Sequence, residues 1–178
     1  MTIPNIITIL RLAAVPFIIY SVILGWHALA FWLFITAGIS DAVDGFIAKR
    51  FNQKSELGAY LDPLADKALL VSLFVALGIQ GYIPIWLAIL VVSRDVFILC
   101  GIGVAVLMGN PIDIDPLKVS KANTAFQIAL VCIVLAAIAF EFSVEPLVKA
   151  GTFIVAGLTI ASAIAYLLTW IRHLSDAD

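Results

Sequence analysis

Charged side chains are scarce in this chain of 178 residues, and apolar side chains are in excess. Asp, Glu, Lys and Arg make up 12% of the residues, whereas hydrophobic residues make up 63%. A soluble globular domain usually has about a quarter charged and about half apolar residues. The composition therefore excludes an ordinary soluble domain, and it predicts an integral membrane protein with a single domain over residues 1–178.

Cysteine and clustered basic residues are also few. The two cysteines, Cys100 and Cys132, lie in apolar runs without the spacing of a metal site, so we expect both to be small buried residues. The net charge is −2 and there is no basic stripe, which argues against nucleic-acid binding. Residues 1–11 lack a basic start, and Arg11 interrupts their apolar run, so a cleavable signal peptide is not expected.

Apolar runs dominate the chain, and six of them are long enough to cross a bilayer, which takes about 20 residues per helix. Backbone polar groups must be paired inside a bilayer, so each run is expected to form a helix. The predicted fold is therefore all-α, with six transmembrane helices. The expected spans are about residues 4–25, 28–49, 57–80, 83–108, 120–140 and 147–171.

Lysine and arginine are distributed unevenly over the predicted connections. Basic residues gather on the cytoplasmic side of membrane proteins. Of the connections on one side of the membrane, only the one near Lys149 carries a basic residue. The opposite side, which also holds both termini, is therefore expected to face the cytoplasm. The basic residues on that second side are Lys49, Arg50, Lys54, Lys118, Lys121 and Arg172.

Four aspartates lie where the second run ends and the third begins. Asp41 and Asp44 are three residues apart, and Asp62 and Asp66 are four apart, so each pair shares one face of a helix. A charge at the centre of a membrane helix costs about 2.5–3.5 kcal/mol on insertion scales. Four unpaired acids would also repel one another, so something cationic is expected to bind between the two pairs.

Small residues accompany the acids on both helix faces, at Gly45, Ala48 and Gly58. Small residues allow helices to approach closely in a membrane, and here they would also leave room for a ligand. A short connection should make the two helices antiparallel neighbours. Carboxylate oxygens suit Mg²⁺, Mn²⁺ or Ca²⁺, and no nearby His or Cys suggests zinc. Paired ions could stabilise a displacement at phosphate, with one acid serving as general base.

Two other interpretations of the acids are ordinary helix-end charges and the cation pathway of a transporter. Helix-end charges explain one or two acids, but not four on facing stripes with interleaved glycines. Transporters place such groups near the middle of the bilayer, often within internal repeats, and no repeat is visible here. A cation transporter stays as the alternative outside enzymes, and it would carry an ion flux.

The spacing of the acids and small residues from Asp41 to Asp66 resembles the signature of the CDP-alcohol phosphatidyltransferases. The family usually has Arg where this chain has Lys49. The resemblance implies a six-helix membrane fold, usually a homodimer, with an active site open to the cytoplasmic leaflet. It also implies that Asp41, Asp44 and Asp62 hold a first Mg²⁺ or Mn²⁺ ion, and that Asp66 contacts a second ion and acts as the base.

The same resemblance implies the reaction and the residues near the nucleotide. An alcohol oxygen would attack the lipid-bearing phosphate of a CDP-linked lipid, and CMP would leave. For Asn5 and Thr8, a role at the start of a helix is an equal expectation. The residues expected to bind the CDP-lipid are Asn5, Thr8, Gly45, Ala48, Lys49 and Gly58.

Within this family, residues 61–67, 92–96 and 120–124 are most similar to CMP-forming cardiolipin synthases. Phosphatidylglycerophosphate synthases typically have Gly-Lys-x-Lys-Thr in the last segment, whereas Asn123 replaces the second lysine here. One lysine fewer suits phosphatidylglycerol, with one negative charge, better than glycerol 3-phosphate, with nearly two. We therefore expect transfer from CDP-diacylglycerol to phosphatidylglycerol in a bacterial inner membrane, with glycerol 3-phosphate as the alternative acceptor.

Three basic residues, Arg94, Lys118 and Lys121, are candidates to bind the phosphate of the acceptor. The lysines could instead only set the orientation in the membrane, and Arg94 could belong to an internal network, since ionisable groups within spans are functional candidates. Arg94 and Asp95 are adjacent and should not face each other on a helix, so each is expected to have a partner elsewhere.

Arg11 and Lys67 are the remaining basic residues near the acids. We expect them to pair with acids in or near the site, or to extend their charged ends to the membrane interface.

Overall fold

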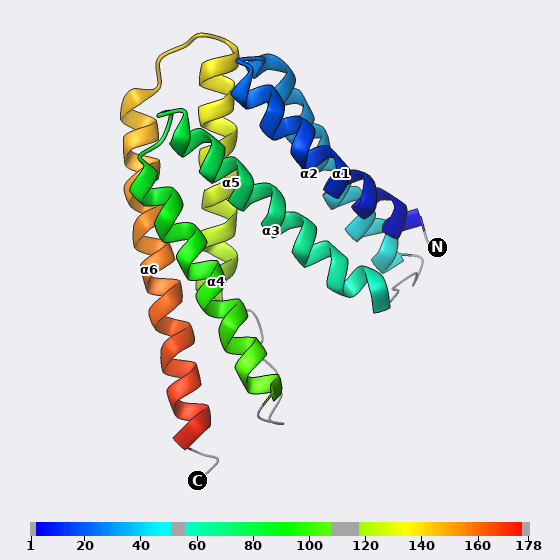
Figure 1. Cartoon of the computed structure of the whole chain (residues 1–178), viewed down its shortest axis with the longest axis vertical. Helices are drawn as coiled ribbons and strands as arrows, with labels where there is room; N and C mark the ends of the chain where they lie inside the picture. The colour runs from blue at the N-terminus through cyan, green and yellow to red at the C-terminus, as the bar shows by residue number, and fades with distance from the viewer. Residues whose placement is uncertain (1–2, 51–55, 108–117, 176–178) are drawn as a thin grey trace.

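The computed structural model describes residues 3–50, 56–107 and 118–175, with side chains for residues 7–41, 65, 67–101, 103 and 118–171. Over these residues the structure is all-helical, as predicted (Figure 1). Each helix agrees with a predicted apolar run to within a few residues at its ends. The helices are α1 (Ile3–Ile23), α2 (His27–Arg50), α3 (Glu56–Ile79), α4 (Ile85–Leu107), α5 (Lys118–Ala139) and α6 (Glu145–Ser175).

Long apolar segments occur in several of these helices. Residues 118–139 in α5 and 145–171 in α6 are long and apolar enough to cross a membrane. Shorter apolar segments occupy residues 7–23, 27–41 and 67–79 among the described residues. Two candidate spans are therefore present in the described part of the chain, and the count of six spans stays a prediction.

The helices form two groups that meet along α2–α5, α3–α4 and, less extensively, α3–α5. In the first group α1 packs against both α2 and α3, and in the second α6 packs against α4 and α5. Figure 1 shows the two groups close together near the short turns and diverging toward the end where α1 begins and α6 ends. Within the described residues α2 and α3 do not contact each other. The prediction that they are direct neighbours is wrong there, and both helices pack against α1 instead.

Apolar side chains fill the interior and also cover the outside. Ile18, Leu73, Phe74 and Leu77 are fully buried between the helices. Large apolar side chains such as Phe17 are nevertheless exposed along the outer helix faces. A soluble monomer rarely exposes large contiguous apolar patches, so this surface is typical of a protein surrounded by lipid.

The two cysteines differ in their environment. Cys132 is half-buried in α5, whereas Cys100 is exposed on α4, and neither forms a disulfide. The expectation that both are buried is therefore wrong for Cys100. Its neighbour Leu99 is also exposed, so Cys100 lies in an exposed apolar stretch of α4.

Three helices end in the same kind of turn at the end of the bundle where the groups meet. Gly25, Gly81 and Glu141 follow α1, α3 and α5 with φ of 76°, 78° and 55°. A residue with positive φ at this position lets the next N–H bond back to a carbonyl of the last helical turn. The bonds are Trp26 N–H to Ser21 O at 2.9 Å, Tyr82 N–H to Leu77 O at 2.9 Å and Phe142 N–H to Ala137 O at 3.2 Å.

The turn after α3 gives a stability prediction. A Cβ at position 81 would meet no atom within 4 Å, so only the backbone conformation opposes a side chain there. The left-handed conformation costs a non-glycine residue about 1–2 kcal/mol. Gly81→Ala should therefore lower the free energy of unfolding by about 1 kcal/mol, measured by reversible unfolding in mixed detergent micelles.

Gly157→Ala is the matched control, because an added Cβ on this α6 residue also meets nothing within 4 Å and the backbone is helical. It should leave stability unchanged or raise it by up to about 1 kcal/mol, the usual advantage of Ala over Gly in a helix. Equal losses from both substitutions would contradict the role of the positive φ.

Candidate functional site

The backbone places the four aspartates at the ends of two helices that flank α1. Positions 41 and 44 lie in the second half of α2, and positions 62 and 66 lie in the first half of α3. Asp41 is the member of this set whose side chain the structure describes. Helix α1 packs against both of these helices.

Asp41 forms an ion pair with Arg11 of α1. Arg11 Nη1 donates a hydrogen bond to Asp41 Oδ1 at 2.6 Å. The Arg11 side chain is 1% exposed and the Asp41 side chain is 42% exposed, so a buried guanidinium holds a carboxylate at the protein surface. The prediction that Arg11 pairs with an acid near the site is confirmed. One oxygen of Asp41 is thereby oriented, while its carboxylate stays accessible.

A cavity of about 360 Å³ adjoins this ion pair between α2, α3 and α5, and we call it the α2–α5 cavity. Its polar residues include Arg11, Asp41 and Thr124, and most of its wall is apolar. Asp41 follows the apolar lining residues along α2, and Thr124 precedes them along α5, so the polar part lies toward the end of α2 and the start of α5. The lining residues are Arg11, Phe34, Ile35, Ala37, Gly38, Ile39, Asp41, Leu69, Leu70, Thr124, Ile128 and Cys132.

Most of the predicted nucleotide and metal residues have side chains outside the described set. They are Asn5, Asp44, Gly45, Ala48, Lys49, Gly58, Asp62 and Asp66. Among the described residues no group of three or more His, Cys, Asp or Glu side chains gathers. The predicted metal site therefore depends on residues outside that set. The donors it would use are all carboxylate oxygens, which fit Mg²⁺ or Mn²⁺, and Asp41 has the exposure that a metal ligand needs.

The structure bears on one alternative for Asn5 and Thr8. Because α1 begins at Ile3, Asn5 lies in the first turn of the helix, whereas Thr8 lies beyond that turn. The helix-start role is therefore wrong for Thr8 and stays a prediction for Asn5, whose side chain lies outside the described set. Thr8 is buried, with 1% of its surface exposed, on the same helix face as Arg11 one turn later.

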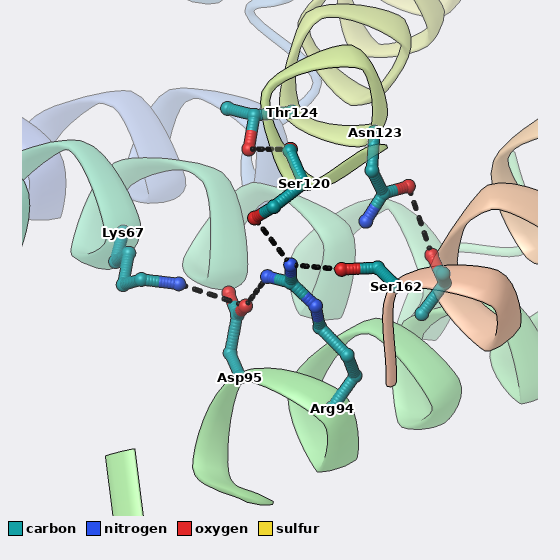
Figure 2. A network of polar contacts seen from close by, with 8 residues as sticks. Lys67, Arg94, Asp95, Ser120, Asn123, Thr124 and Ser162 are labelled. Carbon is teal, nitrogen blue, oxygen red and sulfur yellow. Dashed lines mark hydrogen bonds and ion pairs between the residues drawn. The ribbon is translucent and has the colours of Figure 1, made fainter. Parts of the chain in front are cut away.

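Arg94 and Asp95 of α4 form the centre of a buried polar network that joins four helices (Figure 2). Asp95 Oδ1 accepts from Arg94 Nη1 at 2.6 Å and lies 2.8 Å from Lys67 Nζ of α3. Arg94 Nη2 donates to Ser120 Oγ of α5 at 2.6 Å and to Ser162 Oγ of α6. The predictions of outside partners for both residues and of an acid partner for Lys67 are confirmed.

The expectation that Arg94 and Asp95 do not face each other is wrong. The rule for adjacent positions describes where Cα–Cβ bonds point, whereas the arginine side chain is long enough to return to its neighbour. Ser162 was not predicted as a network residue. One sequence feature could have indicated it: Ser162 and Thr159 are two hydroxyl residues three positions apart in the otherwise apolar helix α6.

Asn123 lies between α5 and α6 rather than on an open surface. It is fully buried, its Oδ1 accepts from Thr159 Oγ1 at 3.1 Å, and its Nδ2 has no hydrogen-bond partner among the described residues. The neighbouring Thr124, not Asn123, lines the α2–α5 cavity. The hypothesis that one lysine fewer lowers the charge of an open pocket therefore does not fit this position, because the side chain is enclosed.

Lys118 and Lys121 are exposed in the first turn of α5. Arg94, by contrast, is 4% exposed, and both of its terminal nitrogens donate to protein oxygens. Of the three predicted phosphate-binding residues, the two lysines are therefore the accessible ones, and the geometry of Arg94 matches the network role.

Comparison with known proteins gives one family and several relatives. The model of the family described as CDP-alcohol phosphatidyltransferase matches residues 1–173. A probable CMP-forming cardiolipin synthase of Drosophila melanogaster is 34% identical over 97% of this chain and 58% of its own length. The CMP-forming cardiolipin synthase of Homo sapiens is 34% identical over 93% of this chain and 60% of its own length.

A more distant relative is the chloroplastic CDP-diacylglycerol–glycerol-3-phosphate 3-phosphatidyltransferase 1 of Oryza sativa subsp. japonica. It is 32% identical over 93% of this chain and 56% of its own length. The chain thus spans less than two thirds of the length of these relatives.

The Arg11–Asp41 pair can be tested by a double-mutant cycle with Arg11→Met and Asp41→Asn. Residues in one ion pair usually show an interaction energy of about 0.5–3 kcal/mol. We expect a coupling of at least about 1 kcal/mol, because the guanidinium is enclosed. The measurement is reversible unfolding in mixed micelles with EDTA, so that metal binding does not contribute.

The control replaces Asp41→Asn with Glu145→Gln, at the start of α6 and at the opposite end of the bundle. Distant substitutions usually add within about 0.3–0.5 kcal/mol, so this cycle should show no coupling. Additive effects of Arg11→Met and Asp41→Asn would show that the ion pair does not stabilise the fold.

Proposed function

The chain belongs to the CDP-alcohol phosphatidyltransferase family, and on that premise we propose that it is a CMP-forming cardiolipin synthase. It would transfer the phosphatidyl group of CDP-diacylglycerol to phosphatidylglycerol and release CMP. The observation that carries the proposal is the similarity to proteins described as CMP-forming cardiolipin synthases, at 34% identity over 93–97% of this chain.

The four aspartates would hold one or two Mg²⁺ or Mn²⁺ ions. When bound, the ions would neutralise the diphosphate and stabilise the charge on the departing CMP. Asp41, Asp44 and Asp62 would be ligands of the first ion and Asp66 of the second. The Arg11–Asp41 contact supports this role, because it orients one oxygen of an exposed carboxylate at the polar part of the α2–α5 cavity.

Asp66 would act as the general base. A terminal hydroxyl of phosphatidylglycerol would transfer its proton to the Asp66 carboxylate, and its oxygen would form a bond to the phosphorus that carries diacylglycerol. The bond from this phosphorus to the oxygen of CMP would break, and CMP would take the electron pair. A base needs to lie within hydrogen-bond reach of the proton that it removes.

Two features of the structure support lipid substrates. The α2–α5 cavity has mostly apolar walls next to Asp41, which suits a lipid chain with a phosphate at its end. Lys118 and Lys121 are exposed at the start of α5 and would bind the phosphate of the acceptor. Asn5, Thr8, Gly45, Ala48, Lys49 and Gly58 would surround the cytidine nucleotide.

The proposed arrangement in the membrane is six spans, a homodimer, and an active site with both termini on the cytoplasmic side of a bacterial inner membrane. Each helix has 21–31 residues, and about 20 suffice to cross a bilayer. The exposed lysines of α5 lie at the end of the bundle where α2 ends and α3 begins, which agrees with the positive-inside rule.

A second candidate function keeps the chemistry and uses glycerol 3-phosphate as the acceptor. The similarity to the rice glycerol-3-phosphate 3-phosphatidyltransferase, 32% identical over 93% of this chain, favours it.

The choice of acceptor can be measured directly. Purified protein with Mg²⁺ or Mn²⁺ and CDP-diacylglycerol is offered phosphatidylglycerol or glycerol 3-phosphate, and the lipid products and CMP are quantified. We expect cardiolipin and CMP with phosphatidylglycerol, little CMP with glycerol 3-phosphate, and none with EDTA. Product from glycerol 3-phosphate alone would support the second candidate and overturn the first.

The role of the base predicts that Asp66→Asn lowers the rate of CMP release by at least about 100-fold, since general acid–base catalysis contributes about 10²–10⁴-fold. The melting temperature in detergent should stay near that of the unmodified protein. Glu145→Gln, a change of the same type at the opposite end of the bundle, should keep full activity. A near-normal rate for Asp66→Asn would remove Asp66 as the base.

A further inference from the structure

The Lys67–Asp95–Arg94 cluster links the two helix groups at a level where α3 and α4 are no longer in close contact. The turn between these helices is short, and Gly78 packs close to α4 there: an added Cβ would lie 3.0 Å from Ile85 Cδ1. From the turn the two helices diverge (Figure 1). Lys67 lies about three turns of helix before Gly78, and its ammonium still reaches Asp95 Oδ1 at 2.8 Å.

We propose that this cluster is a positioning device that fixes the rotation of α3 and thereby places the carboxylates of Asp62 and Asp66 for divalent-cation binding. The inference rests on the metal site of the proposed function. Lys67 and Asp95 are positioning residues here and not metal ligands or catalytic residues.

The rotation of α3 matters because Asp66 immediately precedes Lys67 and Asp62 lies one turn earlier. A helix with its side chains is about 10–12 Å across. A carboxylate oxygen therefore lies about 5–6 Å from the axis, and a rotation of about 10° moves it by about 1 Å. Metal–ligand distances tolerate deviations of about 0.2 Å, so even a small rotation of α3 would disturb a site shared with α2.

Apolar contacts alone specify this rotation weakly. Near Lys67, the side chains of Ala65, Leu69 and Leu70 are buried in the bundle. Burial of apolar surface is non-directional, so these contacts specify the rotation less sharply than a bond between two particular atoms does. The ion pair is directional, because the ammonium must meet one carboxylate oxygen.

Asp95 is itself held in a fixed position. The same Oδ1 accepts from Arg94 Nη1 at 2.6 Å, and Arg94 Nη2 is bonded to Ser120 and Ser162. The Asp95 side chain is 11% exposed and that of Arg94 is 4% exposed, so neither has much freedom to move. Figure 2 shows Lys67 approaching this anchored carboxylate from α3. The ion pair thus fixes α3 relative to three helices, α4, α5 and α6.

Electrostatics and positioning predict opposite results for Lys67→Met. Removing a positive charge near a cation site should, by charge alone, strengthen cation binding. If Lys67 positions α3, the substitution should instead weaken the apparent affinity for Mn²⁺ by about 10–100-fold, the usual effect of losing a group that orients metal ligands. Lys67→Arg, which keeps an ion pair with Asp95, should restore affinity to within about threefold.

The test is a Mn²⁺ titration of the purified 178-residue chain in detergent, followed by electron paramagnetic resonance of the free ion, with melting temperatures measured in EDTA. Thr159→Val is the matched control. It removes a buried hydrogen bond to Asn123 between α5 and α6 without touching α3, so it should lower the melting temperature and leave Mn²⁺ affinity unchanged.

Three outcomes would overturn the inference: Mn²⁺ binding by Lys67→Met as tight as or tighter than in the unmodified protein, a loss of affinity in Thr159→Val as large as in Lys67→Met, or no Mn²⁺ binding by the unmodified chain. CMP release from CDP-diacylglycerol and phosphatidylglycerol is measured on the same preparations. Mn²⁺ binding without CMP release would overturn the proposed reaction, while the comparison of variants would still decide the positioning role.

Discussion

A charged side chain inside an apolar helix bundle needs a partner of opposite charge, and this requirement organises the structure. Arg11 is enclosed and meets Asp41; Asp95 is enclosed and meets both Lys67 and Arg94. Removing one partner of such a pair leaves a charge without compensation, which costs far more than the pair itself contributes. Each pair therefore specifies which helices lie together.

The two pairs serve the two helix groups differently. The Arg11–Asp41 pair lies within the first group, between α1 and α2, and leaves the carboxylate accessible. The cluster around Asp95 connects α3 of the first group to the second group and encloses its acid. An acid that is exposed and oriented suits a ligand, whereas an acid that is enclosed and shared by two cations suits a fixed reference point for neighbouring helices.

Much of the fold could be predicted because apolar run length and the need to pair backbone groups leave few alternatives to a helix in lipid. The observed helix ends also agree closely with the predicted ends, since Gly25 and Gly81 permit the turns that follow α1 and α3. The same turn after α5 uses Glu141, which carries no such signal. The exposure of Cys100 likewise escaped prediction, because an all-apolar helix does not reveal which face is turned outward.

The sequence by itself determined the helices, the family and the pairs of acid positions, because these depend on spacing within one helix and on composition. Only the tertiary structure decided that α2 and α3 both pack on α1 without contacting each other over the described residues, that Arg11 meets Asp41, and that Asn123 is enclosed rather than facing an open pocket. Packing between helices far apart in sequence depends on complementary surfaces and partner charges, and no periodicity within a single helix encodes which other helix supplies them.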